Sequence, residues 1–460
     1  LASFVAVIIF SRELGAAPLG TYYPFVALLG ILAIPADFGI GSAAQKRISE
    51  GEDASQYLSS AIALKLPILA VVSFLIIAAR GYVNQYLGAS LAIPFVATLI
   101  VSQGAHLAIG VLRGELRVGE TAIIEVLQPF GWLVFGYALY TQEYGVYALI
   151  YGHLIGSVLM LVVGWWKVSI SITQPTIEHT KSLFEYGKYS TIASVGGYFY
   201  SWMDVAILSL FVSLGVVSTR AGIGAYENAW RLSLVVMILT QAISTSIFPQ
   251  FSQWAAEDAI ERIEGVLHTA LLPGIILTIP AFVGTLILSE DLLSILYGPK
   301  FTIAGMTLII LAGEKIFQSI HSILGRVLWG IDRPDVAAYM ITISIATNLI
   351  LNVILIWQFG IVGAAVATTG ASIVLAGLQL RYVRRYITID FPLKETAWSI
   401  VASCIMGGAI HLAKLNIEID SLLPLFSLIL FGVLIYVVVI LLYSPIRITI
   451  QQVLNPILSG

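Results

Sequence analysis

The chain has 460 residues, of which 58% are hydrophobic and only 11% are charged, with a formal net charge of −3. A soluble protein of this length would carry about 25% charged residues, so the composition excludes a soluble globular domain. Apolar runs of about 20 residues recur along the chain, and each is long enough to cross a ~30 Å hydrocarbon layer. The short alternating strands of a membrane barrel are not seen, so we predict an all-α polytopic membrane protein.

The chain begins with ten apolar residues, LASFVAVIIF, before Ser11. Ten residues make roughly 15 Å of helix, about half of a span. We therefore expect the numbering to start inside the first transmembrane helix.

Further apolar segments follow, which makes about fourteen predicted helices in all. A polar stretch at 167–188, KVSISITQPTIEHTKSLFEYGK, separates the sixth from the seventh and is predicted to be a loop. The predicted spans after the first are 22–44, 58–79, 91–112, 121–140, 145–166, 190–212, 223–248, 267–288, 302–329, 336–358, 361–381, 397–413 and 421–443.

The Lys and Arg residues of the short loops indicate the orientation, because they are retained on the cytoplasmic side. Fifteen of them fall in one alternating set of loops and five in the other. This bias predicts that both termini lie in the cytoplasm. The three remaining basic residues lie within predicted spans, and they are Lys65, Arg231 and Lys315.

An internal repeat determines the expected architecture. Four pairs of glycines recur in order at an offset of 204 to 216 residues: Gly20 and Gly224, Gly88 and Gly298, Gly114 and Gly330, and Gly145 and Gly360. Each repeat holds six helices, an even number, so both copies cross the membrane in the same direction. Transporters built from such parallel repeats bind their substrate at the interface between the repeats.

We therefore predict two six-helix lobes around a central cavity. The N-terminal lobe is expected at residues 1–180 and the C-terminal lobe at 181–390. Residues 391–460 are expected to add two transmembrane helices and a short cytoplasmic tail.

Three segments carry a resemblance to a known family: RELGAAPLGTYYPFVALLGILAIPADFGIGSAAQKRIS, ILYGPKFTIAG and NLILNVILIWQFGIVGAAVATTGASIV. They resemble the polysaccharide-transporter branch of the multidrug/oligosaccharidyl-lipid/polysaccharide exporter superfamily, and in particular the Wzx-type flippases. The resemblance covers essentially the whole chain. It implies twelve to fourteen helices and an inner-membrane flippase that moves a polyprenyl-diphosphate-linked oligosaccharide outward by alternating access.

The partners that follow from this resemblance are the lipid-linked oligosaccharide, membrane lipids, and a glycan polymerase or glycosyltransferases of the same pathway. We expect a monomer in the cell membrane that binds no nucleic acid.

Eight ionisable side chains lie at membrane depth. Each would cost ~2.5–3.5 kcal/mol if it faced lipid at mid-depth, so all should face protein or water. They are Asp37, Lys65, Glu125, Asp204, Glu227, Arg231, Glu314 and Lys315.

Glu227 and Arg231 lie four residues apart, on one face of a helix and in the more favourable order. One interpretation is a buried ion pair that ties helices together. The other is that Arg231 binds the lipid diphosphate and Glu227 holds it until the substrate arrives, because a guanidinium contacts phosphate oxygens bidentately. We favour the second.

Lys65 and Lys315 are the other candidate diphosphate ligands. The alternative for Lys65 is a side chain that extends back to the lipid headgroups. Lys315 lies about 20 Å along its predicted helix, where such an extension is harder. We expect that its neighbour Glu314 points about 100° away and is not its direct partner.

Four carboxylates are candidates for ion coupling or gating: Asp37, Asp204, Glu227 and Glu314. Asp204 is the strongest candidate for binding a coupling H+ or Na+, and its alternative is a pairing with Arg231 across the lobes. For Asp37 a structural role, locking loops or capping a neighbouring helix, is favoured.

No enzyme signature is present. The six His have no metal-ligand spacing, and no glycine-rich loop precedes a Lys-Ser/Thr pair, so we expect no metal or other cofactor beyond a coupling H+ or Na+. A cation-coupled drug or small-molecule antiporter of the same superfamily is the alternative function, because intramembrane carboxylates suit a cationic cargo. A membrane glycosyltransferase would need a longer loop than this chain offers.

Overall fold

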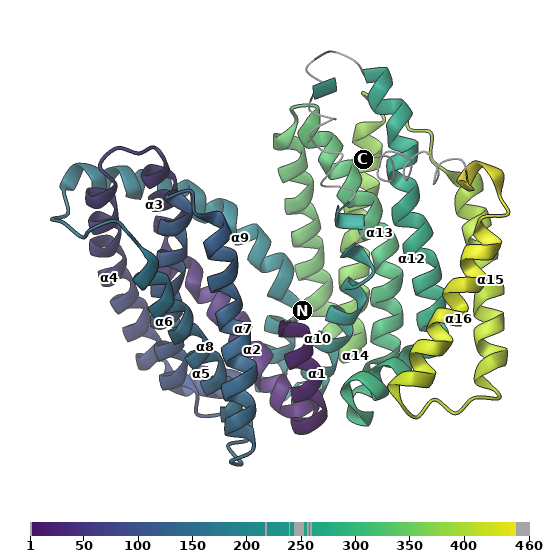
Figure 1. Cartoon of the computed structure of the whole chain (residues 1–460), viewed down its shortest axis with the longest axis horizontal. Coiled ribbons are helices and arrows are strands. Elements are labelled where there is room, and N and C mark those ends of the chain that lie inside the picture. The colour runs from purple at the N-terminus through teal and green to yellow at the C-terminus, as the bar shows by residue number, and fades with distance from the viewer. Residues whose placement is uncertain are drawn as a thin grey trace. The chain divides into compact units, whose positions relative to one another are not determined.

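The computed structural model describes residues 2–216, 219–238, 240–242, 253–254, 257 and 260–447. This part of the chain is helical and contains no β-strand (Figure 1). Within it, ten helices are long and apolar enough to cross a membrane. The prediction of an all-α polytopic membrane protein is confirmed.

Residues pack into two compact units, Leu1–Gly224 and Ala225–Gly460, which we call the N-terminal and the C-terminal unit. The N-terminal unit contains α1 (Ala2–Leu14), α2 (Ala16–Asp37), α3 (Ile40–Ser49), α4 (Ala54–Ala78), α5 (Arg80–Leu87), α6 (Ala92–Gly114), α7 (Val118–Tyr140), α8 (Val146–Lys167), α9 (Ile177–Ser213) and the start of α10 (Arg220–Leu234).

The C-terminal unit contains the rest of α10 and the later helices. These are α12 (Ile260–Tyr297), the 3-10 helix η1 (Pro299–Ala304), α13 (Gly305–Gly330), α14 (Pro334–Val383), α15 (Leu393–Lys414) and α16 (Leu422–Ile440).

Helix α9 packs against α2, α3 and α4 and so belongs to the N-terminal unit by its contacts. The boundary between packing units therefore lies after α9, whereas the repeat was divided at residue 180 from the sequence. The latter division stays a prediction about the repeat.

The predicted span at 22–44 has the wrong bounds, because the helix breaks within it. α2 ends at Asp37, and Phe38 and Gly39 have φ of 48° and 68°, so α3 begins at Ile40 in a new direction. Glycine is needed at the second position for a further reason: a Cβ on Gly39 would lie 2.2 Å from the Gly187 carbonyl oxygen of α9.

The prediction that 167–188 is a loop is wrong in its second half, since α9 begins at Ile177. Thr176 caps this helix, and its side-chain oxygen accepts a hydrogen bond from the His179 backbone N–H. A threonine at this position satisfies one of the free N–H groups of the first turn, which favours helix despite the polar sequence.

The later predicted spans agree better with the structure. The spans at 336–358 and 361–381 are the two halves of α14, which breaks at Gly360 with φ 57° and ψ −130°. The two predicted C-terminal helices correspond to α15 and α16. The span at 223–248 begins with α10, and residues 243–248 lie outside the described residues.

The internal repeat is visible in the backbone. Gly145, which precedes α8, has φ 56° and ψ −129°, almost the same as its repeat counterpart Gly360. Leu116 and Asp332, which also correspond in the repeat, have φ of 62° and 57°. Residues other than glycine seldom adopt positive φ, so this coincidence supports two copies of one helical arrangement.

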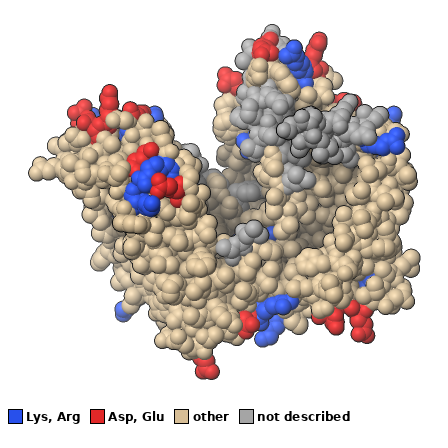
Figure 2. All heavy atoms as spheres, in the orientation of Figure 1, with Lys and Arg blue, Asp and Glu red and all other residues tan. Residues whose placement is uncertain are grey.

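Charge and small residues are distributed as expected for helices packed in lipid. On the face shown in Figure 2, charged side chains mostly gather toward the ends of the helices and leave an uncharged band between them. α7 and α8 approach closely where glycines meet: a Cβ on Gly131 would lie 2.6 Å from the Cα of Gly156. Such small residues let helix backbones come together in a membrane.

Candidate functional site

Each of the three basic residues predicted inside a span forms an ion pair with a predicted carboxylate. The pairs are Arg231 with Glu227, Lys315 with Glu314, and Lys65 with Asp37. They differ in how much of the cation stays accessible.

Helix α10 carries the Glu227–Arg231 pair, and the predicted contact is confirmed. Arg231 Nη2 lies 2.8 Å from Glu227 Oε1, one helical turn away. The Glu227 side chain is 2% exposed, whereas that of Arg231 is 30% exposed. The carboxylate is therefore buried, whereas about a third of the Arg231 side chain is accessible.

The Glu314–Lys315 pair lies on α13, and the expectation that these neighbours do not contact each other is wrong. Lys315 Nζ lies 2.6 Å from Glu314 Oε2, and the two side chains are 2% and 0% exposed. Successive residues do point about 100° apart, but the four methylenes of lysine reach around the helix. Ser372 of α14 donates a hydrogen bond of 2.6 Å to Glu314 Oε1. This pair is enclosed in the C-terminal unit.

The Lys65–Asp37 pair joins α4 to the end of α2. Lys65 Nζ lies 2.6 Å from Asp37 Oδ1, so the interpretation in which Lys65 extends to the headgroups is wrong. The Asp37 oxygens also accept long hydrogen bonds of 3.3 Å from the Gly41 backbone N–H in the first turn of α3. A carboxylate is favourable there because it satisfies a free N–H group, which agrees with the predicted capping role.

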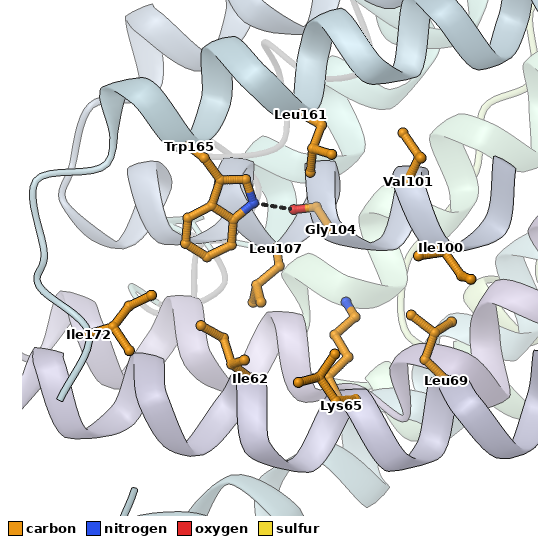
Figure 3. Close-up of a pocket in the computed structure, with 11 residues that line it drawn as sticks. Ile62, Lys65, Leu69, Ile100, Val101, Gly104, Leu107, Leu161, Trp165 and Ile172 are labelled. Carbon is orange, nitrogen blue, oxygen red and sulfur yellow. Dashed lines mark hydrogen bonds between the residues drawn. The ribbon is translucent and has the colours of Figure 1, made fainter. Parts of the chain in front are cut away.

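Lys65 also lines a pocket of about 450 Å³ between α4, α6 and α8 (Figure 3). The walls are otherwise apolar side chains, and Trp165 Nε1 donates a hydrogen bond of 3.1 Å to the Gly104 carbonyl. Since the Lys65 ammonium is engaged by Asp37, this pocket presents an apolar surface.

Asp204 lies on α9 and is partly buried. Its coupling role stays a prediction. Glu125 of α7 accepts a hydrogen bond of 2.7 Å from Arg113, a residue assigned to a loop from the sequence. In the structure Arg113 is in the last turn of α6.

A second pocket, which sequence reasoning missed, lies on the polar side of the Lys65–Asp37 pair. It has a volume of about 250 Å³ and is lined by α2, α3, α6 and α9. From α6 it receives Gln103, His106 and Arg113, together with Asp37 from α2. The spacing of the three α6 residues, three and then seven positions apart, places them on one helix face and could have indicated this pocket.

With this geometry in view, comparison with known proteins identifies the family. Residues 9–304 match the model of a family described as polysaccharide biosynthesis protein. The chain belongs to this polysaccharide biosynthesis family. The resemblance to Wzx-type flippases is thereby confirmed.

Two relatives from Haloferax volcanii are similar to most of the chain. One, named probable low-salt glycan biosynthesis flippase Agl15, is 45% identical over 96% of this chain and 93% of its own length. Another, named probable flippase AglR, is 33% identical over 78% of this chain and 74% of its own.

The fold of this family member is also found among solved structures. A structure of the lipid II flippase MurJ, in an inward closed conformation, covers 99% of this chain and 97% of its own with a TM-score of 0.79. At 19% identity this likeness shows the fold alone.

Proposed function

We propose that the chain is a flippase that carries a polyprenyl-diphosphate-linked oligosaccharide across the cytoplasmic membrane by alternating access, with both termini in the cytoplasm. The polysaccharide biosynthesis family, one relative named a glycan biosynthesis flippase and another named a flippase support this substrate class. A glycan polymerase or glycosyltransferases of the same pathway would be its partners, and we propose that it acts as a monomer.

One observation carries the proposed mechanism: the Arg231 side chain is 30% exposed, although it lies on a helix of an apolar chain and pairs with a buried carboxylate. A diphosphate is anionic, and a guanidinium donates two parallel hydrogen bonds to its oxygens. Lys65 and Lys315 are only 6% and 2% exposed in their ion pairs, so we place the diphosphate at Arg231.

In this mechanism Glu227 holds the guanidinium in position while the site is empty. When the lipid arrives, the diphosphate oxygens occupy the exposed side of Arg231. Phosphate binding and the Glu227 contact then use different N–H groups of the same planar fork.

The antiporter alternative is weaker, because it needs carboxylates that are available to a cationic cargo. Glu125, Glu227 and Glu314 each pair with a Lys or Arg at 2.6–2.8 Å. Their charge is already balanced within the protein.

Transport against a gradient needs an energy source, and we propose that Asp204 binds a coupling H+ or Na+. The Asp204→Asn variant should then lower net transport while substrate binding stays measurable. If the wild-type protein kept its full transport rate after the ion gradients were collapsed, ion coupling would be contradicted.

The proposed function is tested with the purified chain in proteoliposomes. A polyprenyl-diphosphate-linked oligosaccharide is placed in the outer leaflet, and its movement is followed by protection from an added glycosidase. We expect protection with the wild-type protein and none in protein-free vesicles. Transport of a lipophilic cation without any movement of the lipid-linked glycan would favour the antiporter.

A further inference from the structure

We propose that the 250 Å³ pocket of the N-terminal unit binds one neutral sugar residue of the lipid-linked glycan. This inference rests on the proposed function and adds a subsite to it. The pocket lies within the N-terminal unit and is formed by α2, α3, α6 and α9. Its volume is below the ~300–1,000 Å³ of pockets for drug-sized ligands, so it suits one small unit rather than a whole oligosaccharide.

The first argument is the charge balance of the lining. Asp37 pairs with Lys65 at 2.6 Å, and Arg113 pairs with Glu125 at 2.7 Å. The positive and negative charges at the pocket therefore cancel. A diphosphate would require an excess of cations, and a cationic cargo an excess of carboxylates, so this lining favours an uncharged polar ligand.

The second argument is the supply of hydrogen-bonding groups. Ser42, Gln45, Gln103 and His106 line the pocket beside the ion pairs. Hydroxyl, amide and imidazole groups both donate and accept hydrogen bonds, as do the hydroxyls of a sugar. Gln103 and His106 lie on α6, which is long and apolar enough to span a membrane, and such side chains are costly against lipid, so their position indicates a polar occupant.

Of the polar α6 residues in the lining, His106 is the most available to that occupant. Its side chain is exposed although it lies within the span of α6, and no described residue hydrogen-bonds to its ring. By contrast, Gln103 is 4% exposed and already donates a long hydrogen bond of 3.4 Å to the Ala33 carbonyl. We therefore assign the main sugar contact to His106.

An aromatic ring completes the lining. Tyr198 of α9 is 39% exposed, and a Cβ on Gly30 of α2 would lie only 2.4 Å from its Cε1 atom. The absence of a side chain at Gly30 lets the ring lie against α2. A tyrosine presents an apolar ring and a polar hydroxyl, which match the C–H faces and the hydroxyls of a sugar.

The test uses the full chain in lipid nanodiscs with two probes: a polyprenyl diphosphate, and the same lipid carrying one neutral hexose. We expect the wild-type protein to bind the hexose-bearing probe more tightly. In the His106→Ala variant this preference should fall by about two- to tenfold, the usual worth of one hydrogen bond, while affinity for the sugar-free probe is unchanged. His411→Ala, the same change at an exposed position of α15, is the matched control and should retain the preference.

The outcomes separate this inference from the proposed function. Unchanged preference in His106→Ala, or an equal loss of affinity for both probes, would overturn the sugar subsite. If the wild-type protein bound neither probe, the proposed function itself would fail. Unchanged affinity of His106→Ala for the sugar-free probe also reports that the variant is folded. The Tyr198→Ala variant should likewise lose affinity only for the hexose-bearing probe.

Discussion

In the C-terminal unit, α10 and α13 each carry a Glu and a basic residue that form a short ion pair. On α13 both side chains of the Glu314–Lys315 pair are almost inaccessible, at 0% and 2% exposed. On α10 the Arg231 side chain is 30% exposed, although its partner Glu227 is as buried as Glu314. We therefore propose that these similar pairs serve different purposes: the accessible cation of α10 binds the ligand, and the enclosed pair of α13 is structural.

The largest expected effect comes from the accessible pair. If Arg231 binds the diphosphate, Arg231→Ala and Arg231→Gln should both abolish flipping in proteoliposomes. Arg231→Lys should retain part of it, because the positive charge survives while the bidentate geometry is lost. Full activity of Arg231→Gln would remove the distinction between the two pairs.

The enclosed pair should respond in stability rather than in transport. Lys315→Met leaves the Glu314 charge buried without its cation and should lower the free energy of unfolding by about 3–5 kcal/mol. The double change Glu314→Gln with Lys315→Met keeps an acceptor for Ser372 and should recover both the thermal stability in detergent and the flipping rate. A stable double variant that does not flip would show that this pair also acts on the substrate.

The Lys65–Asp37 pair of the N-terminal unit should give an intermediate effect, because Asp37 is 27% exposed. Lys65→Met should destabilise the chain by about 1.5–3 kcal/mol, the worth of a charged hydrogen bond. Adding Asp37→Asn keeps an oxygen for the Gly41 N–H and should restore most of the loss, as measured by thermal unfolding. No change in the single variant would contradict a structural role for this pair.

An ion pair on the protein surface should give the smallest effect on stability. Lys181 and Glu185 on α9 lie 4.0 Å apart with side chains 74% and 57% exposed. Lys181→Ala should change stability by no more than about 0.5 kcal/mol, because water and salt screen such pairs. A loss as large as that of Lys65→Met would mean that burial is not what sets these energies.

Sequence reasoning succeeded where the information is local. The spans follow from runs of apolar residues, and the contact between Glu227 and Arg231 follows from their spacing on one helix. The repeat was predicted from glycines that recur at a similar offset. In the structure two of them, Gly145 and Gly360, have the same unusual backbone conformation.

The remaining features depend on tertiary packing or on side-chain reach. Lys65 and Asp37 are 28 positions apart, and only the packing of α4 against α2 brings them together. The Glu314–Lys315 contact does not follow from the Cβ directions of successive residues, because it depends on the length of the lysine side chain. The polar pocket was missed because its lining comes from four helices. Only the α6 residues have a spacing that places them on one helix face.

The most direct test of the diphosphate site is flipping by the double variant Glu227→Gln with Arg231→Gln. Removing both charges together leaves neither member of this pair as a buried charge without the other, so the variant should fold with a thermal stability close to that of the wild-type protein. If Arg231 holds the diphosphate, we predict that this stable variant moves no lipid-linked oligosaccharide in proteoliposomes. Flipping at the wild-type rate would contradict the assignment and indicate that the Glu227–Arg231 pair is a structural ion pair, like the pair on α13.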